Sequence, residues 1–535
     1  MIGIKEFYDI LDDYTLNDNK EEFTKYASSL GVYSERAEGK FMIRYKFTGG
    51  IVLPSELRGI ANILDKIEYD SIHFTTRQDI QFHHLSADEL KFVMDKCEKL
   101  NITSLGSGGP TTRNIQISPL SGVDVDEKYD ITDYVLKGSE YLLEVDPLYT
   151  LPKKYKISFS NTYEDTVNAT VSDLGFIAAI KDGEKGFVVY GGGGMGMMPS
   201  VAIKLYDFDK AENITYHMLA MRNIFNEHGE RKIKAKARVR HILQRLGEDE
   251  FRRIYIKEVN SLKKELNLKL NITENKKQYE LKPLIAKREY PLIKFSKFRS
   301  IIYKQKQSGY YSLYIHPYLG DMSRESLTRL LDVVELLDYR VSIRLTNTQG
   351  FYIRDIKEYD VGKFIHAIDY YPQKVFSSVA CTGSTTCKKG ILHSKEMLNS
   401  ILNNLQSERH TTLINIPKMH ISGCPNSCGQ HQIGVLGLCG RLRKKKLGPM
   451  PYYGIFINGK LSKNTSLGYE IGELPGKKII DFLREVSFLK RESKIKEFEV
   501  FFKEKEEDIK NIITTLGDID EEDGNLYLDY KSDLD

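Results

Sequence analysis

Cys381-Thr-Gly-Ser-Thr-Thr-Cys387 is one of two cysteine-rich segments in this chain, and the other is Gly423-Cys424-Pro-Asn-Ser-Cys428-Gly429. Together they hold four of the six cysteines among 535 residues, spaced C-x5-C and C-x3-C. Thiolates are the usual ligands of iron–sulfur clusters, which take four of them. Glycine and proline around each pair suit tight turns that aim several thiolates at one point. The pattern predicts an iron–sulfur cluster.

Two other interpretations of these cysteines stay open. Structural zinc sites usually use C-x2-C or C-x4-C pairs, and neither spacing here matches them. Inert buried thiols would not gather in glycine-rich turns. Of the other two cysteines, we expect Cys97 in a helical core and Cys439 packed near the second pair.

Length and composition describe an ordinary globular chain. With 41% apolar and 28% charged residues and a net charge of +4, nothing indicates a nucleic-acid partner. The length predicts two to four domains. Few cysteines, no signal-peptide pattern and no apolar run of ~18 residues predict a soluble protein of the reducing cytoplasm, away from membranes.

Two parts of the chain repeat the same order of strand, helix and strand. Arg77-Gln78 then aligns with Thr348-Gln349, 271 residues later. A second alignment places Lys154 on Lys418, at an offset of 264 residues. These matches predict an internal duplication of about half the chain. The repeated segments are 41–47, 54–65 (with Ser55 as N-cap) and 71–76 in the first copy, and 310–315, 323–337 and 339–345 in the second.

The two halves differ in their chemistry. The second carries the four cysteines, whereas the first carries basic residues near strand ends: Arg44, Arg77, Arg113, Lys154 and Lys156. Lys154 and Lys156 alternate on one strand and should point to the same face, an arrangement that by itself is more typical of a solvated edge than of a site. The division predicts one site between the halves, with a metal centre on one side and positive charge on the other.

At this point the residues resemble a known family. Ala380-Cys-Thr-Gly and Ser422-Gly-Cys-Pro-Asn-Ser-Cys-Gly-Gln430 are similar to the signature of the sirohaem-containing sulfite and nitrite reductases. The resemblance runs from about residue 30 to about residue 490. Further segments that resemble the family, in its order, are 41–44, 75–83, 113–114, 151–156 and 191–194.

The resemblance implies cofactors and site residues. Cys381, Cys387, Cys424 and Cys428 would hold a [4Fe–4S] cluster, and Cys428 would also be axial to the sirohaem iron. The carboxylates of sirohaem suit the planar fork of arginine and the compact charge of lysine. The residues implied on the substrate side are Arg44, Arg113, Lys154 and Lys156, and those implied to bind cofactor are Arg77, Gln81, His83, Gly191, Gly192, Gly193 and Asn426.

Two features point to different substrates. The cluster segments look more like the ferredoxin–nitrite reductases, whereas Lys156 looks like the sulfite reductases. A further cation favours sulfite, which approaches a dianion, over singly charged nitrite. We therefore expect six-electron reduction of sulfite to sulfide with an external donor such as ferredoxin. The alternatives are reduction of nitrite to ammonia and, in another class, a non-enzymatic iron–sulfur electron carrier.

The family implies a mixed α/β (α+β) fold, duplicated, with two ferredoxin-like half-domains and two sirohaem-binding α/β domains. The basic run 441–446 has three interpretations: a cofactor contact, a donor-docking site or a solvated loop. We expect the acidic C-terminus to be mobile or peripheral. The expected divisions are an N-terminal wrapping segment 1–38, a half-domain 39–100, a cationic domain 101–270, a linker 271–300, a second half-domain 301–360, a cluster domain 361–510 and an acidic tail 511–535.

Overall fold

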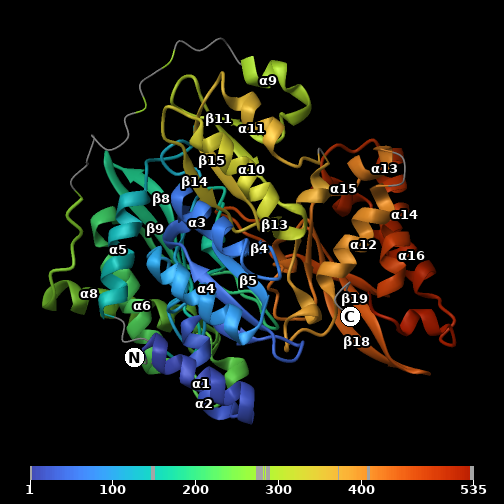
Figure 1. Cartoon of the computed structure of the whole chain (residues 1–535), viewed down its shortest axis with the longest axis horizontal. Coiled ribbons are helices and arrows are strands. Elements are labelled where there is room, and N and C mark those ends of the chain that lie inside the picture. The colour runs from blue at the N-terminus through green and yellow to red at the C-terminus, as the bar shows by residue number, and fades with distance from the viewer. Residues whose placement is uncertain are drawn as a thin grey trace.

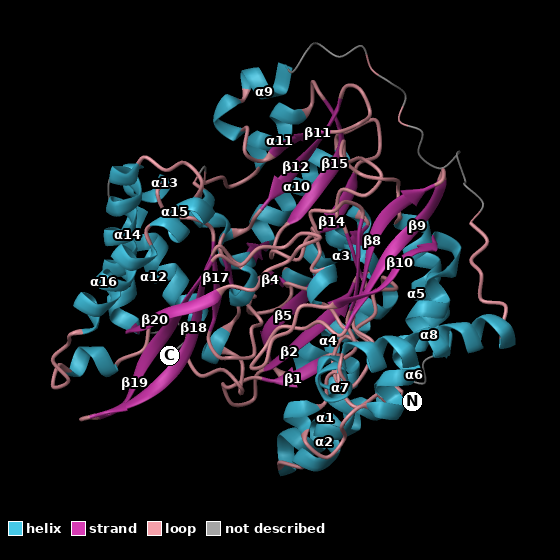
Figure 2. Ribbon diagram, turned by 180° about the vertical axis from the view of Figure 1, so that it is seen from behind, coloured by secondary structure: helices cyan, strands magenta, loops and turns pink. Residues whose placement is uncertain are grey.

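The chain is seen in a computed structural model that describes residues 3–145, 151–272, 281, 284, 290–371, 373–406 and 410–530. Across these residues the strands form four five-stranded sheets, with helices packed on them (Figures 1 and 2). Helices and strands are interleaved throughout, which confirms the mixed α/β class. No helix in the described part of the chain is both long and apolar enough to cross a membrane.

Two of the sheets belong to the ferredoxin-like half-domains, and each includes one strand from the other half. The first has the order β1-β2-β5-β4-β13, and the second has the order β11-β12-β15-β14-β3. The bounds are β1 Val32–Ser34, β2 Phe41–Lys46, β3 Ile51–Val52, β4 Ser71–Phe74 and β5 Asp79–Leu85; then β11 Ile302–Lys304, β12 Tyr310–Ile315, β13 Asp321–Ser323, β14 Ser342–Leu345 and β15 Phe351–Lys357.

The half-domains share one apolar core, because their buried residues form a single continuous cluster. Helices α3 and α10 pack against each other across the two copies. Helix α3 begins at Pro54, so its N-cap is Leu53 and not Ser55 as predicted, and Glu56 accepts the Leu53 N–H at 2.7 Å. The helices here are α1 Ile4–Asn17, α2 Lys20–Ala27, α3 Pro54–Leu64, α4 Ala87–Lys99, α9 Tyr290–Lys294, α10 Arg324–Glu335 and α11 Val361–Ala367.

The other two sheets form two α/β domains with separate apolar cores. Both have the same layout: three neighbouring parallel strands, followed by two antiparallel ones. The strands are β6 Gln116–Ile117, β7 Ile157–Ser160, β8 Leu174–Lys181, β9 Glu184–Gly191 and β10 Ile203–Lys210; then β16 Val379–Ala380, β17 Met419–Ser422, β18 Leu436–Lys445, β19 Gly448–Ile457 and β20 Tyr469–Pro475.

Helices flank both sheets. They are α5 Thr132–Val145, α6 Ile214–His228, α7 Val239–Leu246 and α8 Glu248–Glu265 in the first α/β domain, and α12 Ser394–Gln406, α13 His410–Ile414, α14 Ile479–Ser493, α15 Phe498–Glu504 and α16 Glu506–Gly517 in the second. In Figure 1 the second domain, in orange and red, lies beside the blue-to-green first half.

The repeated layout confirms the internal duplication, but the register of the second predicted alignment is wrong. Asn168 and Gln430 both adopt a left-handed backbone just before a 3₁₀ turn, with φ of 65° and 64°. Pairing of β7 with β8 and of β17 with β18 agrees with this offset of 262 residues. Lys418 is therefore equivalent to Lys156, and not to Lys154. A shift of two residues keeps every side chain on its face, so strand alternation could not reveal the error.

Two buried glutamines repeat one contact in both halves. Gln78 exchanges two hydrogen bonds with the backbone of Ile117 in β6, at 2.8 and 3.1 Å. Gln349 does the same with Ala380 in β16, at 2.8 and 2.9 Å. Both glutamines have positive φ, at 57° and 60°. Each fixes the first strand of an α/β sheet to a half-domain turn.

The C-terminal segment is not a free extension. Asp529 accepts the His393 N–H at 2.8 Å, and the buried Tyr530 donates its hydroxyl to Gly476 O at 3.0 Å. The predicted linker 271–300 lies partly outside the described residues, and the domain boundaries remain our proposed division of the chain.

We expect Gln78→Ala and Gln349→Ala each to lower the free energy of unfolding by about 2–4 kcal/mol, because each change leaves buried backbone groups without a partner. Guanidinium denaturation followed by circular dichroism measures this. The exposed Gln406 at the end of α12 supplies the control, and Gln406→Ala should stay within about 0.5 kcal/mol. Equal stability of all three variants would contradict the assigned role.

Candidate active site

The four cysteines of the signature meet at one edge of a sheet. Cys381 directly follows β16, and Cys424 lies two residues beyond β17. These strands are parallel neighbours, so their carboxyl ends, and the loops that leave them, lie at the same edge. Burial, and then the nearby Cys428, raise the pKa of Cys381 to about 12. Burial also raises the pKa of Cys424, with contributions from Cys428 and Cys387, so the four thiols are electrostatic neighbours.

Polar groups and glycines hold these loops. The Gly423 N–H donates to Cys381 Sγ at 3.3 Å, and Asn426 Nδ2 donates to Cys424 Sγ at 3.4 Å. An added Cβ at Gly423 would lie 2.4 Å from Leu392 O, and one at Gly429 would lie 1.8 Å from Ile421 O. Only glycine allows the loops to pack this closely.

The donor set fits a cluster better than a single ion. All four thiols are free, and Cys387 and Cys428 are exposed. Within the described residues, no three His, Cys, Asp or Glu side chains lie close enough to bind one metal ion. Zinc would require its sulfurs to be about 4 Å apart or less, given Zn–S bonds of about 2.3 Å. A multi-iron cluster is larger, and it holds four thiolates at wider separation.

Four predicted substrate residues come together on the facing wall. Arg44 lies opposite Gln81 in the β2–β5 pairing, and Gln81 Oε1, when turned toward it, accepts from Arg44 Nε at 3.3 Å and Nη2 at 3.0 Å. Arg113 donates to Thr111 Oγ1 at 3.0 Å. Burial lowers the pKa of Arg113 to about 10, and the nearby Arg44 contributes to that lowering.

Lys154 and Lys156 complete this wall and face the cysteine segment. Burial, followed by Arg238, lowers the pKa of Lys154 to about 7. Burial, followed by Lys154, lowers the pKa of Lys156 well below that of a free lysine. Cys428, by contrast, raises the pKa of both lysines. The structure therefore brings Cys428, from the second half, within electrostatic range of the cations of the first.

Sequence reasoning missed two arginines of this wall. Arg238 is buried and forms a bidentate ion pair with buried Asp173, with contacts of 2.8–3.1 Å. Asp173 also accepts the Lys156 N–H at 2.9 Å, which fixes the strand that carries the lysines. Arg240 Nε is buried without a partner, and burial lowers the pKa of Arg240 to about 10. In the sequence, basic and apolar residues alternate over 232–240, and this pattern could have indicated that the two arginines share one face of the chain.

Arg77 lies behind this wall and serves the protein itself. It donates to Gln116 Oε1 and, at 2.8 Å, to Ile157 O, so it connects a half-domain turn to β6 and β7. Burial lowers its pKa to about 9, and its Nε has no partner. A cofactor contact for Arg77 therefore remains a prediction, with Nε as the available donor.

His83 shares the buried carboxylate of Glu35 with His84. The His83 Nδ1–Glu35 distance is 2.7 Å and the His84 Nδ1–Glu35 distance is 2.9 Å. The other ring nitrogen of His83 is buried without a partner. His83 lies two residues from Gln81 on β5, so both point to the same face. Its predicted cofactor role rests on that free nitrogen.

Close packing within the protein gives glycines 191–193 a second reason, besides the predicted cofactor contact. Added Cβ atoms at Gly191, Gly192 and Gly193 would meet Leu205, Leu243 and Ser172 O, at 2.5, 2.7 and 2.8 Å, so protein atoms demand the glycines. A cofactor contact there remains a prediction. The loop does reach the cluster domain, because Gly196 exchanges two hydrogen bonds with Gln432, at 2.7 and 3.0 Å.

The basic run 441–446 is mostly neutralised within the chain. Arg441 pairs with Glu470 at 2.8 Å and Arg443 pairs with Glu473 at 2.6 Å. Lys445 pairs with Glu521 at 2.9 Å. These residues lie on the β18–β19 hairpin, so the run is neither a loop nor a free cationic patch.

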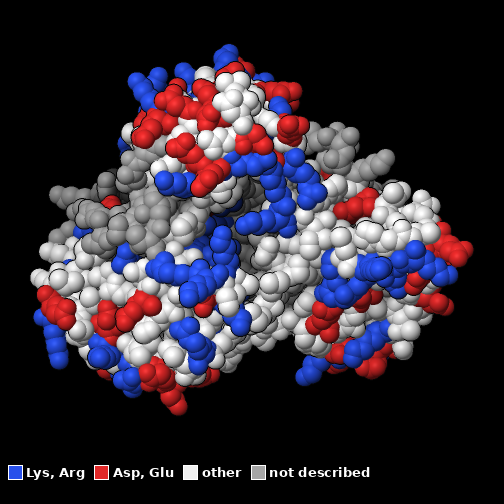
Figure 3. Space-filling model, turned by 90° about the horizontal axis from the view of Figure 1, so that it is seen from below, with Lys and Arg blue, Asp and Glu red and all other residues white. Residues whose placement is uncertain are grey.

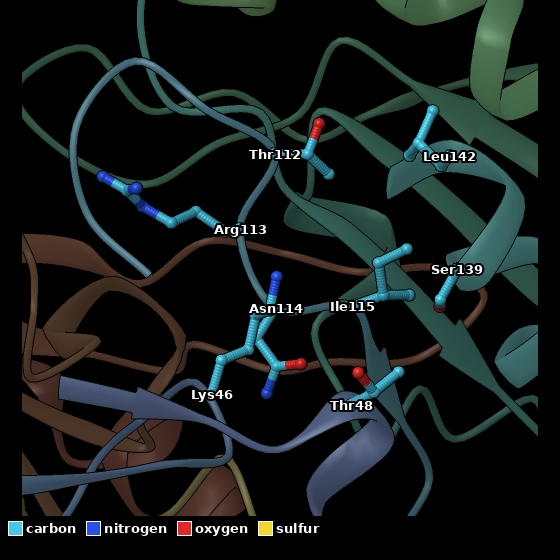
Figure 4. Close-up of a pocket in the computed structure, with 8 residues that line it drawn as sticks. All are labelled: Lys46, Thr48, Thr112, Arg113, Asn114, Ile115, Ser139 and Leu142. Carbon is cyan, nitrogen blue, oxygen red and sulfur yellow. The ribbon is translucent and has the colours of Figure 1, made fainter. Parts of the chain in front are cut away.

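Figure 3 shows Lys and Arg side chains gathered around a hollow near the middle of one face. The small cavity of about 10 Å³ beneath Arg113 is a separate feature, with room for about one water. In Figure 4 the Arg113 side chain points away from Ile115, Ser139 and Leu142, which line that cavity. Its guanidinium is therefore directed out of the apolar layer.

Comparison with known proteins identifies the family. A model described as "Nitrite and sulphite reductase 4Fe-4S domain" matches residues 108–263. A model described as "Nitrite/Sulfite reductase ferredoxin-like half domain" matches residues 34–100 and 303–369. The matched segments together span more than half of the chain. The chain belongs to the nitrite and sulfite reductase family.

Among curated relatives, the ferredoxin–nitrite reductase of Synechococcus elongatus is 26% identical, over 80% of this chain and 82% of the relative. The assimilatory ferredoxin-dependent nitrite reductase of Haloferax mediterranei is 27% identical, over 78% and 74%. The structure of Mycobacterium tuberculosis NirA matches with a TM-score of 0.77 and 20% identity, over 95% of both chains. The last likeness establishes the fold.

The cofactors of this family member are sirohaem and a [4Fe–4S] cluster. The family model named for the cluster covers residues 108–263, which contain none of the four clustered cysteines. Duplication explains this, because that segment and the cysteine-bearing domain are two copies of one α/β unit.

We expect Arg238→Met to lower the free energy of unfolding by about 3–5 kcal/mol, because it leaves Asp173 as an uncompensated buried charge. Urea denaturation of the cofactor-free protein measures this. The control, Arg253→Met, removes an exposed pair with Glu250 and should change stability by less than about 1 kcal/mol. If both variants were equally stable, the Arg238–Asp173 pair would not anchor the wall.

Proposed function

We propose that this chain reduces nitrite to ammonia, with ferredoxin as the electron donor. The observation that supports the proposal is that Cys428, a proposed cluster ligand, lies within electrostatic range of Lys154 and Lys156, which we assign to the anion site. The names of the curated relatives support nitrite as the substrate. Our sequence interpretation had preferred sulfite. In the overall reaction nitrite takes up six electrons and eight protons, giving ammonium and two waters.

We assign the cofactors to the residues that fit them. Cys381, Cys387, Cys424 and Cys428 would hold the cluster, and Cys428 would be shared with the sirohaem iron. The unpartnered nitrogens of Arg77, His83 and Arg240 are donors for sirohaem carboxylates. When bound, the two cofactors supply electrons one at a time and an iron on which the substrate is reduced.

The cationic wall binds the substrate and supplies protons. Arg44 and Arg113 present fixed guanidinium donors to an oxyanion. Burial and mutual repulsion disfavour the charged forms of Lys154 and Lys156, so an arriving anion favours their protonation. Substrate binding is thereby coupled to proton uptake at the lysine Nζ atoms, which then lie beside the oxygens that leave as water.

Sulfite is the second candidate, and Lys156 favours it. A dianion stabilises protonation of two crowded lysines more than a monoanion does, because each extra charge adds to the attraction. Only a comparison of the two substrates under equal conditions separates the candidates.

We expect Lys156→Asn to raise the ratio of kcat/KM for nitrite to kcat/KM for sulfite by about tenfold, which corresponds to about 1.4 kcal/mol. The ratio is measured with reduced ferredoxin at a pH where sulfite is a dianion. Lys154→Met is the matched variant, and it should lower both values with a smaller change in their ratio. An unchanged ratio in Lys156→Asn would remove Lys156 as the determinant, and a wild-type preference for sulfite would overturn the nitrite proposal.

We expect Cys424→Ser to lose most iron and labile sulfide, because it removes one of the cluster thiolates. Cys439→Ala is the control, since Cys439 is a buried neighbouring thiol outside the proposed ligand set, and it should retain full iron content. Metal analysis and the absorption spectrum measure both. A wild-type protein with a cluster but no chlorin-like absorption would instead be an electron carrier.

A further inference from the structure

The duplication creates a second location equivalent to the active site, in which the cysteines are replaced. Ala380 and Ile117 receive the equivalent glutamine contacts, so Cys381 corresponds to Ser118. The same turn follows in both copies: the Cys387 N–H donates to Gly383 O at 3.0 Å, and the Asp124 N–H donates to Leu120 O at 2.9 Å. Asp124 therefore takes the place of Cys387.

The second pair of cysteines is replaced as well. Left-handed residues bracket the equivalent turns, with Asp165 and Asn168 in the first copy and Ser427 and Gln430 in the second. Thr166 accordingly corresponds to Cys428, and both are exposed. Ser118 Oγ and Thr166 Oγ1 share a hydrogen bond at 2.6 Å. Hydroxyl groups paired in this way do not replace a set of thiolates.

A cavity of about 320 Å³ occupies this second location. Its size is at the lower end of the range for small-molecule sites, about 300–1,000 Å³. Its lining comes from three parts of the chain. The first α/β domain contributes Ser118, Asp124, Asn161 and Thr166, the second half-domain contributes Tyr303, Tyr314, Thr348 and Tyr352, and the cluster domain contributes Lys418.

One cation of the active site is retained here. Lys418 occupies the position equivalent to Lys156, and it is the only basic residue lining the cavity. Among the described residues no carboxylate lies within ion-pair distance of it. Burial lowers its pKa to about 8, so its amine is still mostly charged at neutral pH. A half-buried ammonium without a carboxylate in ion-pair range favours an anionic partner.

The other walls define the shape and polarity of that partner. Tyr314 and Tyr352 take the positions of Arg44 and Gln81, and their ring centroids lie 5.0 Å apart. Tyr303 lies 5.3 Å from Tyr352 and is 37% exposed, so the aromatic wall reaches the surface. Asn161 is fully buried, with its Nδ2 donating to Glu127, and its Oδ1 has no partner. The cavity thus offers one cation, the carboxylate of Asp124, flat apolar surfaces and an unsatisfied acceptor.

We propose that this cavity is a second ligand site, which binds a planar aromatic carboxylate that carries a hydroxyl or amino donor. Lys418 receives the carboxylate, the tyrosine rings contact the flat ring, and Asn161 Oδ1 accepts from the donor group. The proposal is independent of whether the enzyme reduces nitrite or sulfite, because it concerns the opposite copy of the duplicated unit.

The test is calorimetric titration of the holoenzyme with 4-hydroxybenzoate as the probe. We expect one site per chain, with binding at least tenfold weaker for phenol, which lacks the carboxylate, and for sulfate, which lacks the ring. Lys418→Met should weaken the probe at least tenfold. Thr166→Phe adds bulk at an exposed lining residue and should also weaken binding of the probe at least tenfold. The control Lys181→Met, which changes an exposed lysine, should leave the affinity for the probe unchanged.

The nitrite-reducing activity of Lys418→Met should equal that of the wild type, which separates this site from the catalytic one. Four results would overturn the proposal. They are no saturable binding of the probe, wild-type affinity for the probe in Lys418→Met and Thr166→Phe, competition of the probe with nitrite, and sulfate binding as tightly as the probe. A content of two sirohaems per chain would also overturn it, because the cavity would then hold a tetrapyrrole.

Discussion

The glutamine at each half-domain turn is the constraint on which the rest of the structure depends. Gln78 bonds to Ile117 and also donates to Leu345 O at 2.8 Å, so one side chain connects a turn, a sheet and the other half of the chain. Gln349 bonds to Ala380 and also contacts the other half of the chain, through the His73 ring nitrogen Nε2 at 3.1 Å. Because Ala380 directly precedes Cys381, the position of the first proposed cluster ligand is set by a side chain of the half-domain. A buried amide is well suited to this, since it satisfies a backbone donor and acceptor together.

The active site concentrates positive charge that the protein alone does not neutralise. Arg113, Lys154 and Lys156 all have lowered pKa values, with burial as the first cause and neighbouring cations as a further one. Asp173 is engaged by Arg238, so it offsets only part of this charge. In the proposed function, an anionic cofactor and substrate would relieve an electrostatic cost that is built into the fold.

The sequence revealed the parts of the site that local chemistry marks. The cysteines were visible from composition and spacing. Strand alternation showed only that Lys154 and Lys156 share a face, and the resemblance to the family supplied their predicted role. Arg238 and Arg240 were missed because they follow a run of lysines that is typical of a solvent-exposed segment. Only the fold shows that Arg238 is buried and paired with Asp173. Lys418 was matched to the wrong partner because a two-residue shift preserves strand alternation. The glycines 191–193 were recognised, but their reason, close packing on Leu205 and Leu243, is a tertiary fact.

The exchange of β3 and β13 between the half-domain sheets has a consequence for the origin of this molecule. Strand β13 pairs with β4, and β3 pairs with β14, so a separated half would leave an open sheet edge. A single-unit ancestor would have closed that edge only with a second copy, as a strand-swapped homodimer with two identical clefts. In a single chain the two clefts need not be identical, so one can carry the four cysteines while the other carries hydroxyl and tyrosine side chains.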